Sequence, residues 1–226
     1  MNEIPTIRAV AFDIDGTLYP NLRMYLVSAP IVLRNFRLFR AFGAARKRVR
    51  RERPITDLPR RTAELTAGIL GRDVSRVADE IDRTIYDRWE SSLARVELYP
   101  GARELILWLR SRGIATAALS DFPVERKLTL LGIKDLWDVA FSAEETGYLK
   151  PNPEPFLRLI EELGVPAGEI LYVGNSYRYD VEGARAVGMV TAHITRKRSV
   201  GKPADFVFSR FSELRRWLEA RIGDAG

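Results

Sequence analysis

The sequence predicts an α/β fold in which helices cover both faces of a parallel sheet. From residue 102 onward, short apolar runs alternate regularly with helical stretches, a pattern that is typical of βαβ units. Between residues 21 and 93 there is no such alternation of strands, and helical spacing recurs instead. We therefore expect a sheet-forming core that is interrupted by a helical segment.

The expected strands of the core are apolar runs, and each is followed by a helical stretch. The strands are predicted at residues 7–13, 114–119, 138–141, 170–173, 189–194 and 206–208. The helices are predicted at residues 104–112, 124–131, 155–163, 181–187 and 211–222. Several glycines fall where these helices should end, as is common at helix C-termini. The core should thus be a doubly wound, Rossmann-like parallel sheet.

The segment after the first strand has a helical period. Its clearest helix places an apolar residue at every fourth position, with charged residues between, at Val77, Ile81, Ile85 and Trp89. Asp73 or Ser75 could cap this helix, and residues 98–101, which include Pro100 and Gly101, break the pattern. We expect residues 1–19 and 99–226 to form the core and residues 20–98 to form an inserted all-helical cap domain.

Composition limits the class of protein. The chain has 226 residues, 46% of them hydrophobic, and no cysteine, which favours a globular protein in a reducing compartment. The longest near-apolar stretch, residues 24–42, contains three arginines, so no membrane span is expected. Residues 1–5 lack the basic region of an export signal. These features predict a cytoplasmic location.

The formal net charge of +6 is concentrated in one segment. Its basic residues are Arg23, Arg34, Arg37, Arg40, Arg46, Lys47, Arg48, Arg50, Arg51, Arg53, Arg60 and Arg61. A solvated helical face is the usual explanation. The alternatives are an anionic partner, nucleic acid or a membrane surface, and recognition of a second anionic group of a substrate. A macromolecular partner is the less favoured reading, because most apolar residues of 25–42 can be used for packing.

Polar side chains follow four of the expected strands at their carboxyl ends, and these ends share one edge of a parallel sheet. These residues are Asp13, Asp15, Ser120, Asp121, Lys150, Asn175 and Asp180. Carboxylates, a hydroxyl, an ammonium and an amide suit phosphoryl transfer assisted by a hard cation such as Mg²⁺. The lone histidine, His193, lies in an expected buried strand and is interpreted as a core residue.

At these positions the chain resembles the haloacid dehalogenase superfamily of hydrolases. Four motifs occur in the order usual for that family: residues 13–18 (DIDGTL), 118–120 (ALS), 150–156 (KPNPEPF) and 173–176 (VGNS), the last continuing to Asp180, Gly183 and Ala184. The helical segment after the first motif is similar to the helical caps of some members, and residues 99–102 (YPGA) resemble the return into their core.

The resemblance implies a role for each residue of the first motif. Asp13 would be the nucleophile that forms an aspartyl-phosphate. Asp15 would be the general acid and base, and its backbone carbonyl would bind the metal. An aspartate at this position favours hydrolysis of phosphate esters over dehalogenation. Gly16 would let the chain approach the phosphoryl group closely, and Thr17 would steady the loop.

The resemblance also assigns the later motifs. Ser120 would hydrogen-bond a phosphoryl oxygen, and Lys150 would neutralise charge there and hold Asp13. Two other lysines, Lys127 and Lys134, are rivals to Lys150, but neither lies in a Lys-Pro-x-Pro loop. The implied metal ligands are Asp13, Asp15, Asn175 and Asp180.

Two residues depart from the common pattern of the family. Asn175 stands where aspartate is commoner, and an amide offers an oxygen without a charge, so metal affinity could be weaker. Asp121 replaces a frequent asparagine in the phosphate-binding and substrate-binding set. A carboxylate there would repel phosphate, so we expect it to turn away and cap the helix that begins near Pro123.

These features lead to the hypothesis of a Mg²⁺-dependent phosphatase that acts on a small phosphorylated metabolite, with the cap closing over the site. The alternatives are a sugar-phosphate mutase of the same family and a binding protein whose basic cap docks an anionic partner. The sequence does not choose the phosphate ester, the role of the basic segment or the oligomeric state.

Overall fold

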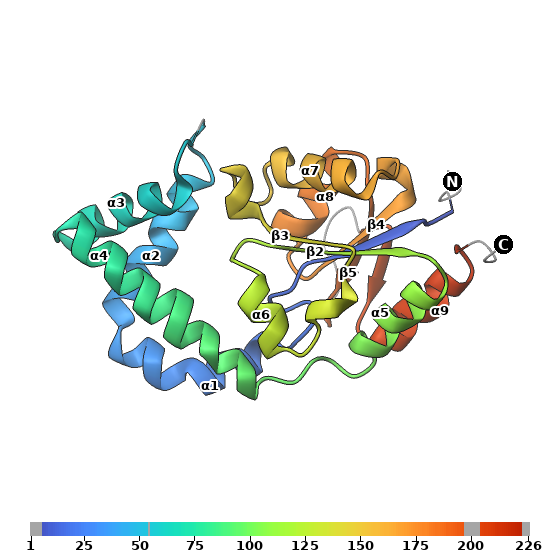
Figure 1. Ribbon diagram of the computed structural model, residues 1–226, viewed down its shortest axis with the longest axis horizontal. Helices are drawn as coiled ribbons and strands as arrows, with labels where there is room; N and C mark the ends of the chain where they lie inside the picture. The colour runs from blue at the N-terminus through green and yellow to red at the C-terminus, as the bar shows by residue number, and fades with distance from the viewer. Residues whose placement is uncertain (1–5, 54, 197–203, 223–226) are drawn as a thin grey trace.

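The core of the molecule is one parallel six-stranded sheet. The computed structural model describes residues 6–53, 55–196 and 204–222, so residues 1–5, used above for the expected absence of an export signal, lie outside the described part. The strands are β1 (Ala9–Phe12), β2 (Ala115–Ser120), β3 (Val139–Ser142), β4 (Ile170–Gly174), β5 (Val190–Ile194) and β6 (Phe206–Phe208). Their order is β3-β2-β1-β4-β5-β6, and all six predicted strands are confirmed within about two residues (Figure 1).

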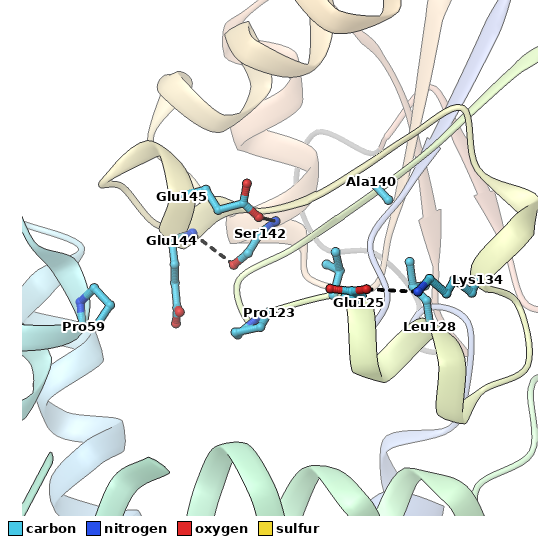
Figure 2. A pocket seen from close by; sticks show the side chains of 10 residues that line it. Pro59, Pro123, Glu125, Leu128, Lys134, Ala140, Ser142, Glu144 and Glu145 are labelled. Carbon is cyan, nitrogen blue, oxygen red and sulfur yellow. Dashed lines mark hydrogen bonds and ion pairs between the residues drawn. The ribbon is translucent and has the colours of Figure 1, made fainter. Parts of the chain in front are cut away.

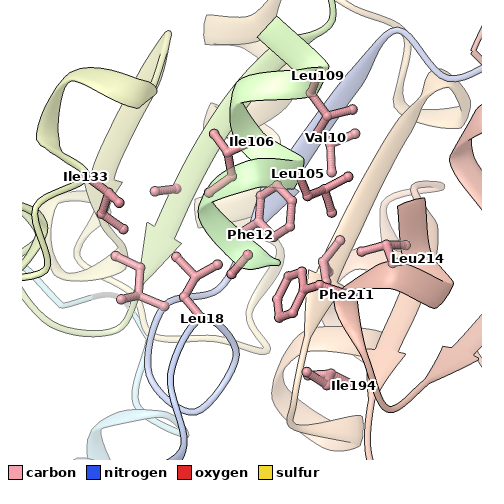
Figure 3. Close-up of a cluster of buried hydrophobic side chains, with 14 of the residues drawn as sticks. Val10, Phe12, Leu18, Leu105, Ile106, Leu109, Ile133, Ile194, Phe211 and Leu214 are labelled. Atoms are coloured by element: carbon pink, nitrogen blue, oxygen red, sulfur yellow. The ribbon is translucent and has the colours of Figure 1, made fainter. Parts of the chain in front are cut away.

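Helices cover both faces of this sheet, as the sequence predicts for a doubly wound fold. The helices of the core are α5 (Ala102–Ser111), α6 (Glu125–Leu130), α7 (Pro153–Leu163), α8 (Glu182–Ala186) and α9 (Phe211–Glu219), with short helical turns at η3 (Lys134–Leu136), η4 (Ala143–Thr146), η5 (Ala167–Glu169) and η6 (Tyr177–Val181). Val10 and Phe12 of β1 pack with α5 and α9 (Figure 3), whereas Ala9 and Ala11 pack toward α7 and α8. This alternation of side chains buries the central strand on both faces.

In the described residues between β1 and α5, every regular element is a helix, and loops join these helices. They are α1 (Asn21–Arg34), α2 (Phe36–Val49), α3 (Leu58–Leu70), α4 (Val74–Ile81), the π-helix η1 (Asp82–Trp89) and the 3₁₀-helix η2 (Ser92–Arg95). We call residues 21–95 the helical insertion, and Figure 1 shows it to one side of the sheet. Asp73 caps α4 by accepting a hydrogen bond from the Arg76 backbone N–H at 3.1 Å, as predicted.

The two ends of the helical insertion meet beside the sheet. The backbone N–H of Tyr99 donates to the carbonyl oxygen of Leu18 at 2.8 Å. The chain therefore leaves the core and returns to it at the same place, close to the carboxyl end of β1. In the ranges that the structure describes, no helix is both long enough and apolar enough to cross a bilayer.

The order of the strands fixes where a site can form. β1 lies between β2 and β4, so the chain runs outward in one direction through β2 and β3 and in the other through β4 to β6. In open α/β sheets, ligands bind outside the carboxyl ends of the strands at this switch point. The loops after β1, β2, β3 and β4 all reach it.

Candidate active site

Asp13 directly follows β1 and is almost fully buried, with 5% of its surface exposed. Thr17, one turn later in the loop, donates a hydrogen bond to Asp13 Oδ2 at 2.6 Å. The loop turns at Gly16, whose φ of 84° favours glycine. A Cβ on Gly16 would lie 2.1 Å from Asn175 Nδ2 and 2.2 Å from Asn21 Nδ2, so any larger residue here would have to displace these two side chains.

Lys150 connects Asp13 to Asp180 inside the protein. Its Nζ lies 2.7 Å from Asp13 Oδ1 and 2.6 Å from Asp180 Oδ1, and it also donates to the Tyr172 hydroxyl at 3.1 Å. Burial raises the pKa of Asp13 to about 7, and the nearby Asp180 and Asp15 add to this, although Lys150 opposes it. The sequence-predicted residues Asp13, Lys150 and Asp180 are thus brought together around one buried ammonium.

Asp15 lies beside Asp13 but has different partners. Tyr19 donates to Asp15 Oδ1, while Ser120 and Lys127 donate to Asp15 Oδ2 at 2.8 and 2.6 Å. Burial acts to raise the pKa of Asp15, but the charge of Lys127 and the donated hydrogen bonds outweigh it, so this pKa lies below its ordinary value. The two carboxyl groups of the Asp13-x-Asp15 pair therefore have pKa values shifted in opposite directions.

Lys127 is the site residue that sequence reasoning missed. It was set aside as a rival to Lys150, yet its side chain is fully buried and it also contacts Ser120 Oγ at 3.2 Å. Its position carries a signal, because Val124, Leu128 and Leu131 lie on the same helical face and are buried. A lysine on an apolar helical face needs an internal partner, and Asp15 is that partner.

Ser120 ends β2 and is fully buried. Its hydroxyl donates to Asp15 and accepts from the Phe122 backbone N–H at 3.2 Å. The structure thus places Ser120 next to Asp15, and no hydrogen bond joins it to Asp13 in the part of the chain that the structure describes.

The prediction that Asp121 caps a helix is wrong. Helix α6 starts at Glu125 after Val124, with no side-chain cap. The Asp121 carboxylate instead pairs with Arg50 of the helical insertion and accepts from the Lys150 backbone N–H at 3.0 Å. A guanidinium and a backbone donor stabilise this partly buried carboxylate. They also offset its negative charge, so it need not turn away to avoid repelling phosphate.

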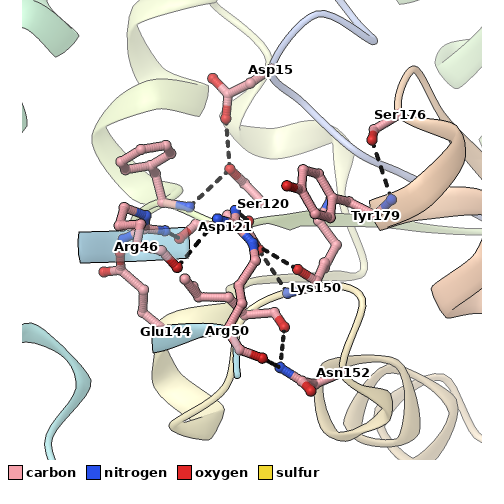
Figure 4. A network of polar contacts seen from close by, with 12 residues as sticks. Asp15, Arg46, Arg50, Ser120, Asp121, Glu144, Lys150, Asn152, Ser176 and Tyr179 are labelled. Carbon is pink, nitrogen blue, oxygen red and sulfur yellow. Dashed lines mark hydrogen bonds and ion pairs between the residues drawn. The ribbon is translucent and has the colours of Figure 1, made fainter. Parts of the chain in front are cut away.

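Arginines of the helical insertion reach the loops of the core (Figure 4). Arg46 pairs with Glu144, donates to the Asp121 carbonyl oxygen at 2.6 Å and stacks 4.3 Å from the centre of the Phe122 ring. Arg50 donates to the Lys150 carbonyl oxygen at 2.9 Å and lies over the Tyr179 ring. The interpretation of the basic segment as a solvated face is wrong for Arg46, which is 4% exposed.

The loop after β4 brings Asn175 and Asp180 to the same edge. The backbone N–H of Ser176 donates to Asp180 Oδ2 at 2.9 Å, and a Cβ on Gly174 would lie 2.2 Å from the Asp180 Cβ. His193 is buried in β5, and its ring Nε2 lies 3.0 Å from the carbonyl oxygen of Asn175. Gly174 therefore allows Asp180 to fold back over the end of the strand toward Lys150.

The donor set is compatible with Mg²⁺. Asp13 and Asp180 could supply carboxylate oxygens and Asn175 an amide oxygen, although no cluster of three acidic or histidine side chains with the geometry of a metal site occurs in residues 6–53, 55–196 and 204–222. Mg²⁺ usually takes only one or two carboxylates and keeps several waters. The hard oxygen donors therefore fit Mg²⁺ better than a metal that requires many protein ligands.

A separate cavity of about 630 Å³ lies where the helical insertion faces the core (Figure 2). It lies between Pro59 of the helical insertion and core residues that include Pro123, Ser142 and Glu144. None of Asp13, Asp15, Lys150 or Asp180 lines it. The cavity is distinct from the carboxylate site.

The fold and the site define an α/β enzyme with an acidic site at the switch point of its sheet. A family model described as haloacid dehalogenase-like hydrolase matches residues 7–188. The chain belongs to this family of hydrolases, as the four motifs predicted.

Relatives support the same assignment along almost the whole chain. The chain is 27% identical over 224 residues to a phosphoglycolate phosphatase of Escherichia coli (strain K12), with 91% of this chain and 88% of the relative covered. It is 28% identical over 205 residues to a glyceraldehyde 3-phosphate phosphatase of Methanopyrus kandleri, with 84% of each covered. The structure of a HAD phosphatase from Thermococcus onnurineus matches with a TM-score of 0.63 and 26% identity, covering 96% of this chain and 100% of that one.

Proposed function

We propose that the protein is a Mg²⁺-dependent phosphatase that hydrolyses a small phosphorylated metabolite through an aspartyl-phosphate. The observation that carries this proposal is the pair Asp13 and Asp15, in which each carboxylate has its own buried lysine, Lys150 and Lys127. The phosphatase relatives support hydrolysis of a phosphate monoester, and both act on small molecules by name.

In the proposed first step, a carboxylate oxygen of Asp13 forms a bond to phosphorus while the bond from phosphorus to the leaving oxygen breaks. Lys150 and Thr17 hold Asp13 in place by contacts at 2.7 and 2.6 Å. Fixed donors of this kind cost no reorganisation during the reaction. The leaving oxygen takes a proton from Asp15.

In the proposed second step, water attacks the phosphorus of the aspartyl-phosphate and gives its proton to Asp15. The bond between phosphorus and Asp13 breaks, so inorganic phosphate leaves and both carboxyl groups return to their starting states. Splitting the reaction in this way replaces one difficult displacement by two easier ones.

Lys127 is the residue that we propose as the support for Asp15 in both steps. With Ser120 and Tyr19 it fixes both carboxylate oxygens of Asp15, and it stabilises the ionised form that remains after the proton is given to the leaving oxygen. The negative charge of an approaching phosphate raises the pKa of a neighbouring carboxyl group, which favours the protonated form needed before the first step.

Asp13, Asp180, Asn175 and the backbone carbonyl of Asp15 are the proposed ligands of Mg²⁺. When bound there, the ion supplies positive charge that favours the ionised form of Asp13 and offsets charge on the phosphoryl oxygens. Because Asn175 is neutral, Asp13 and Asp180 carry the formal negative charge of the ligand set.

The helical insertion is the proposed cap over the site. Arg46 and Arg50 attach it to the loops after β2 and β3: Arg46 donates to the carbonyl oxygen of Asp121, directly after Ser120, and Arg50 donates to that of Lys150. An insertion held in this way can exclude water and select the leaving group.

Replacing Asp13 by asparagine tests the mechanism. D13N should lower turnover of an aryl phosphate with Mg²⁺ by roughly 10⁴-fold or more, because the amide cannot act as the nucleophile. The exposed Asp135→Asn is the matched control, since it should retain wild-type turnover, and thermal unfolding should show that both variants fold. Undiminished turnover in D13N would contradict the proposal. Release of inorganic phosphate, measured with a sugar phosphate, separates a phosphatase from a mutase.

A further inference from the structure

The outer side of α1 exposes an unusual set of large apolar side chains. Leu22, Tyr25, Leu26, Leu33 and Phe36 are 67%, 62%, 64%, 74% and 57% exposed, more than any other large hydrophobic residue in the described parts of the chain. The first four fall within an arc of about 100° on α1 at 3.6 residues per turn, and Phe36 begins α2. We call these five residues the α1 surface.

From the sequence, most of these residues were expected to be buried by packing. Most apolar side chains of residues 25–42 were expected to pack, and Leu38 and Phe42 do so. Tyr25, Leu26, Leu33 and Phe36 do not, and this prediction is wrong for them. The opposite side of α1 is buried through Met24 and Ser28, so the helix is held in place without using its outer side.

Unpaired arginines border the α1 surface. Arg23, Arg34, Arg37 and Arg40 are exposed, and within the described ranges none of them forms an ion pair. Arg46, Arg50, Arg53 and Arg61 of the same basic segment are instead paired with Glu144, Asp121, Glu154 and Glu52. Part of the basic segment is thus neutralised by acidic residues of the protein itself, whereas Arg23, Arg34, Arg37 and Arg40 face solvent beside exposed apolar groups.

This combination of groups identifies the chemistry of the partner. Residues 21–51 contain no aspartate or glutamate, so two copies joined through this face would bring arginines together without counter-charges. A nucleic acid would pair with the arginines but would leave the leucines in water. An anionic bilayer accepts both, because apolar side chains enter the boundary of the acyl chains while arginines reach the lipid phosphates.

We propose that the α1 surface docks on the surface of a membrane that contains anionic phospholipid, with α1 lying in the plane of the interface. This binding is independent of the proposed phosphatase chemistry. It gives a function to the part of the basic segment that the active site does not use.

The test measures binding of the full chain to vesicles by flotation. The protein should float with vesicles of phosphatidylcholine mixed with phosphatidylglycerol at low ionic strength, should do so less at high salt, and should not float with phosphatidylcholine alone. R34Q/R37Q should weaken partitioning roughly 30-fold, at about 1 kcal/mol for each charge. L26S/L33S should weaken it by roughly tenfold or more.

Matched controls come from other helices. L107S/L157S alters leucines that are 46% and 51% exposed on α5 and α7, and R215Q/R216Q removes two charges from α9. Neither pair should change flotation, and circular dichroism should show that all four variants fold.

Three results would overturn the proposal. The first is absence of flotation with anionic vesicles at low salt. The second is a wild-type dimer that L26S/L33S converts to a monomer without any vesicle binding, which would make a second copy the occupant. The third is salt-sensitive retention on duplex DNA that R34Q/R37Q abolishes, with no loss of flotation in L26S/L33S.

Discussion

Lys127 is a fully buried lysine whose ammonium contacts Asp15. Because Asp15 is the proposed general acid, a role of Lys127 in catalysis should affect substrates with different leaving groups differently, whereas a purely structural role should not. Lys127→Met should lower kcat for an alkyl phosphate by about 10²-fold, the lower end of the range for general acid catalysis. The loss should be much smaller for an aryl phosphate with an acidic leaving group, because such a group departs without a proton. Steady-state kinetics with both substrates measure the difference.

The control for Lys127 is Lys134→Met, which removes an exposed lysine whose partner is the exposed Glu125. It should leave both substrates unaffected. An equal loss of kcat for the alkyl and the aryl substrate in K127M would show that Lys127 only maintains the fold of the loop.

At the scale of one element, the start of α9 depends on Glu213. Its carboxylate accepts from the backbone N–H of Ser209 at 2.9 Å and from Arg210, and these contacts lower the pKa of Glu213 to about 2. Because this pKa lies below the ordinary value of 4.5, the stabilisation is present above pH 4.5 and is lost as the pH falls toward 2. E213Q should therefore lower the Tm near neutral pH, and the difference from wild type should disappear in acid.

The matched variant is Glu219→Gln at the end of the same helix, where the carboxylate pairs with the exposed Arg215 and with no other side chain of the described residues. Its Tm should stay close to that of the wild type across the same pH range. If E213Q and E219Q had the same Tm at every pH, the contacts of Glu213 at the start of α9 would not stabilise the fold more than the exposed pair of Glu219.

At the scale of the whole molecule, Arg46 joins the helical insertion to the core. Its pair with Glu144 is buried, with side chains 4% and 8% exposed. Arg46→Met leaves Glu144 without its counter-charge and should lower the free energy of unfolding by about 3–5 kcal/mol. Arg53→Met breaks a more exposed pair with Glu154 and should cost less than about 1 kcal/mol. Urea unfolding measures both. Equal effects would contradict a buried contact between insertion and core in solution.

The core was predictable because its strands have a local signature. β1 and β4 are continuous apolar runs, as strands covered on both faces must be. The change from α4 to the π-helix η1 at Asp82 was not predictable, because Val77, Ile81 and Ile85 keep the same apolar spacing through both elements. Local periodicity therefore identified a helix and its buried face but not its exact backbone geometry.

The candidate site was predictable where strand ends determine it. Asp13, Lys150 and Asp180 meet because parallel strands place their carboxyl ends at one edge. The partners of Asp121 were not predictable, since Arg50 lies 71 residues away in a separate group of helices. Contacts of this kind depend on how the insertion packs on the core, and no local pattern encodes that packing.

The hydrogen bond between Tyr99 and Leu18 has a consequence for how such proteins change over time. Because the polypeptide exits and re-enters the sheet at adjoining points, replacing everything between them leaves the pairing of β1 with β2 and β4 untouched. The entropic cost of closing a loop grows only with the logarithm of its length, so excursions of very different size can be exchanged there. The sheet with its site residues and the helical insertion, which we propose as the cap, can therefore diverge separately. A chimaera that joins this sheet to the insertion of a relative would have to re-create the contacts made by Arg46 and Arg50.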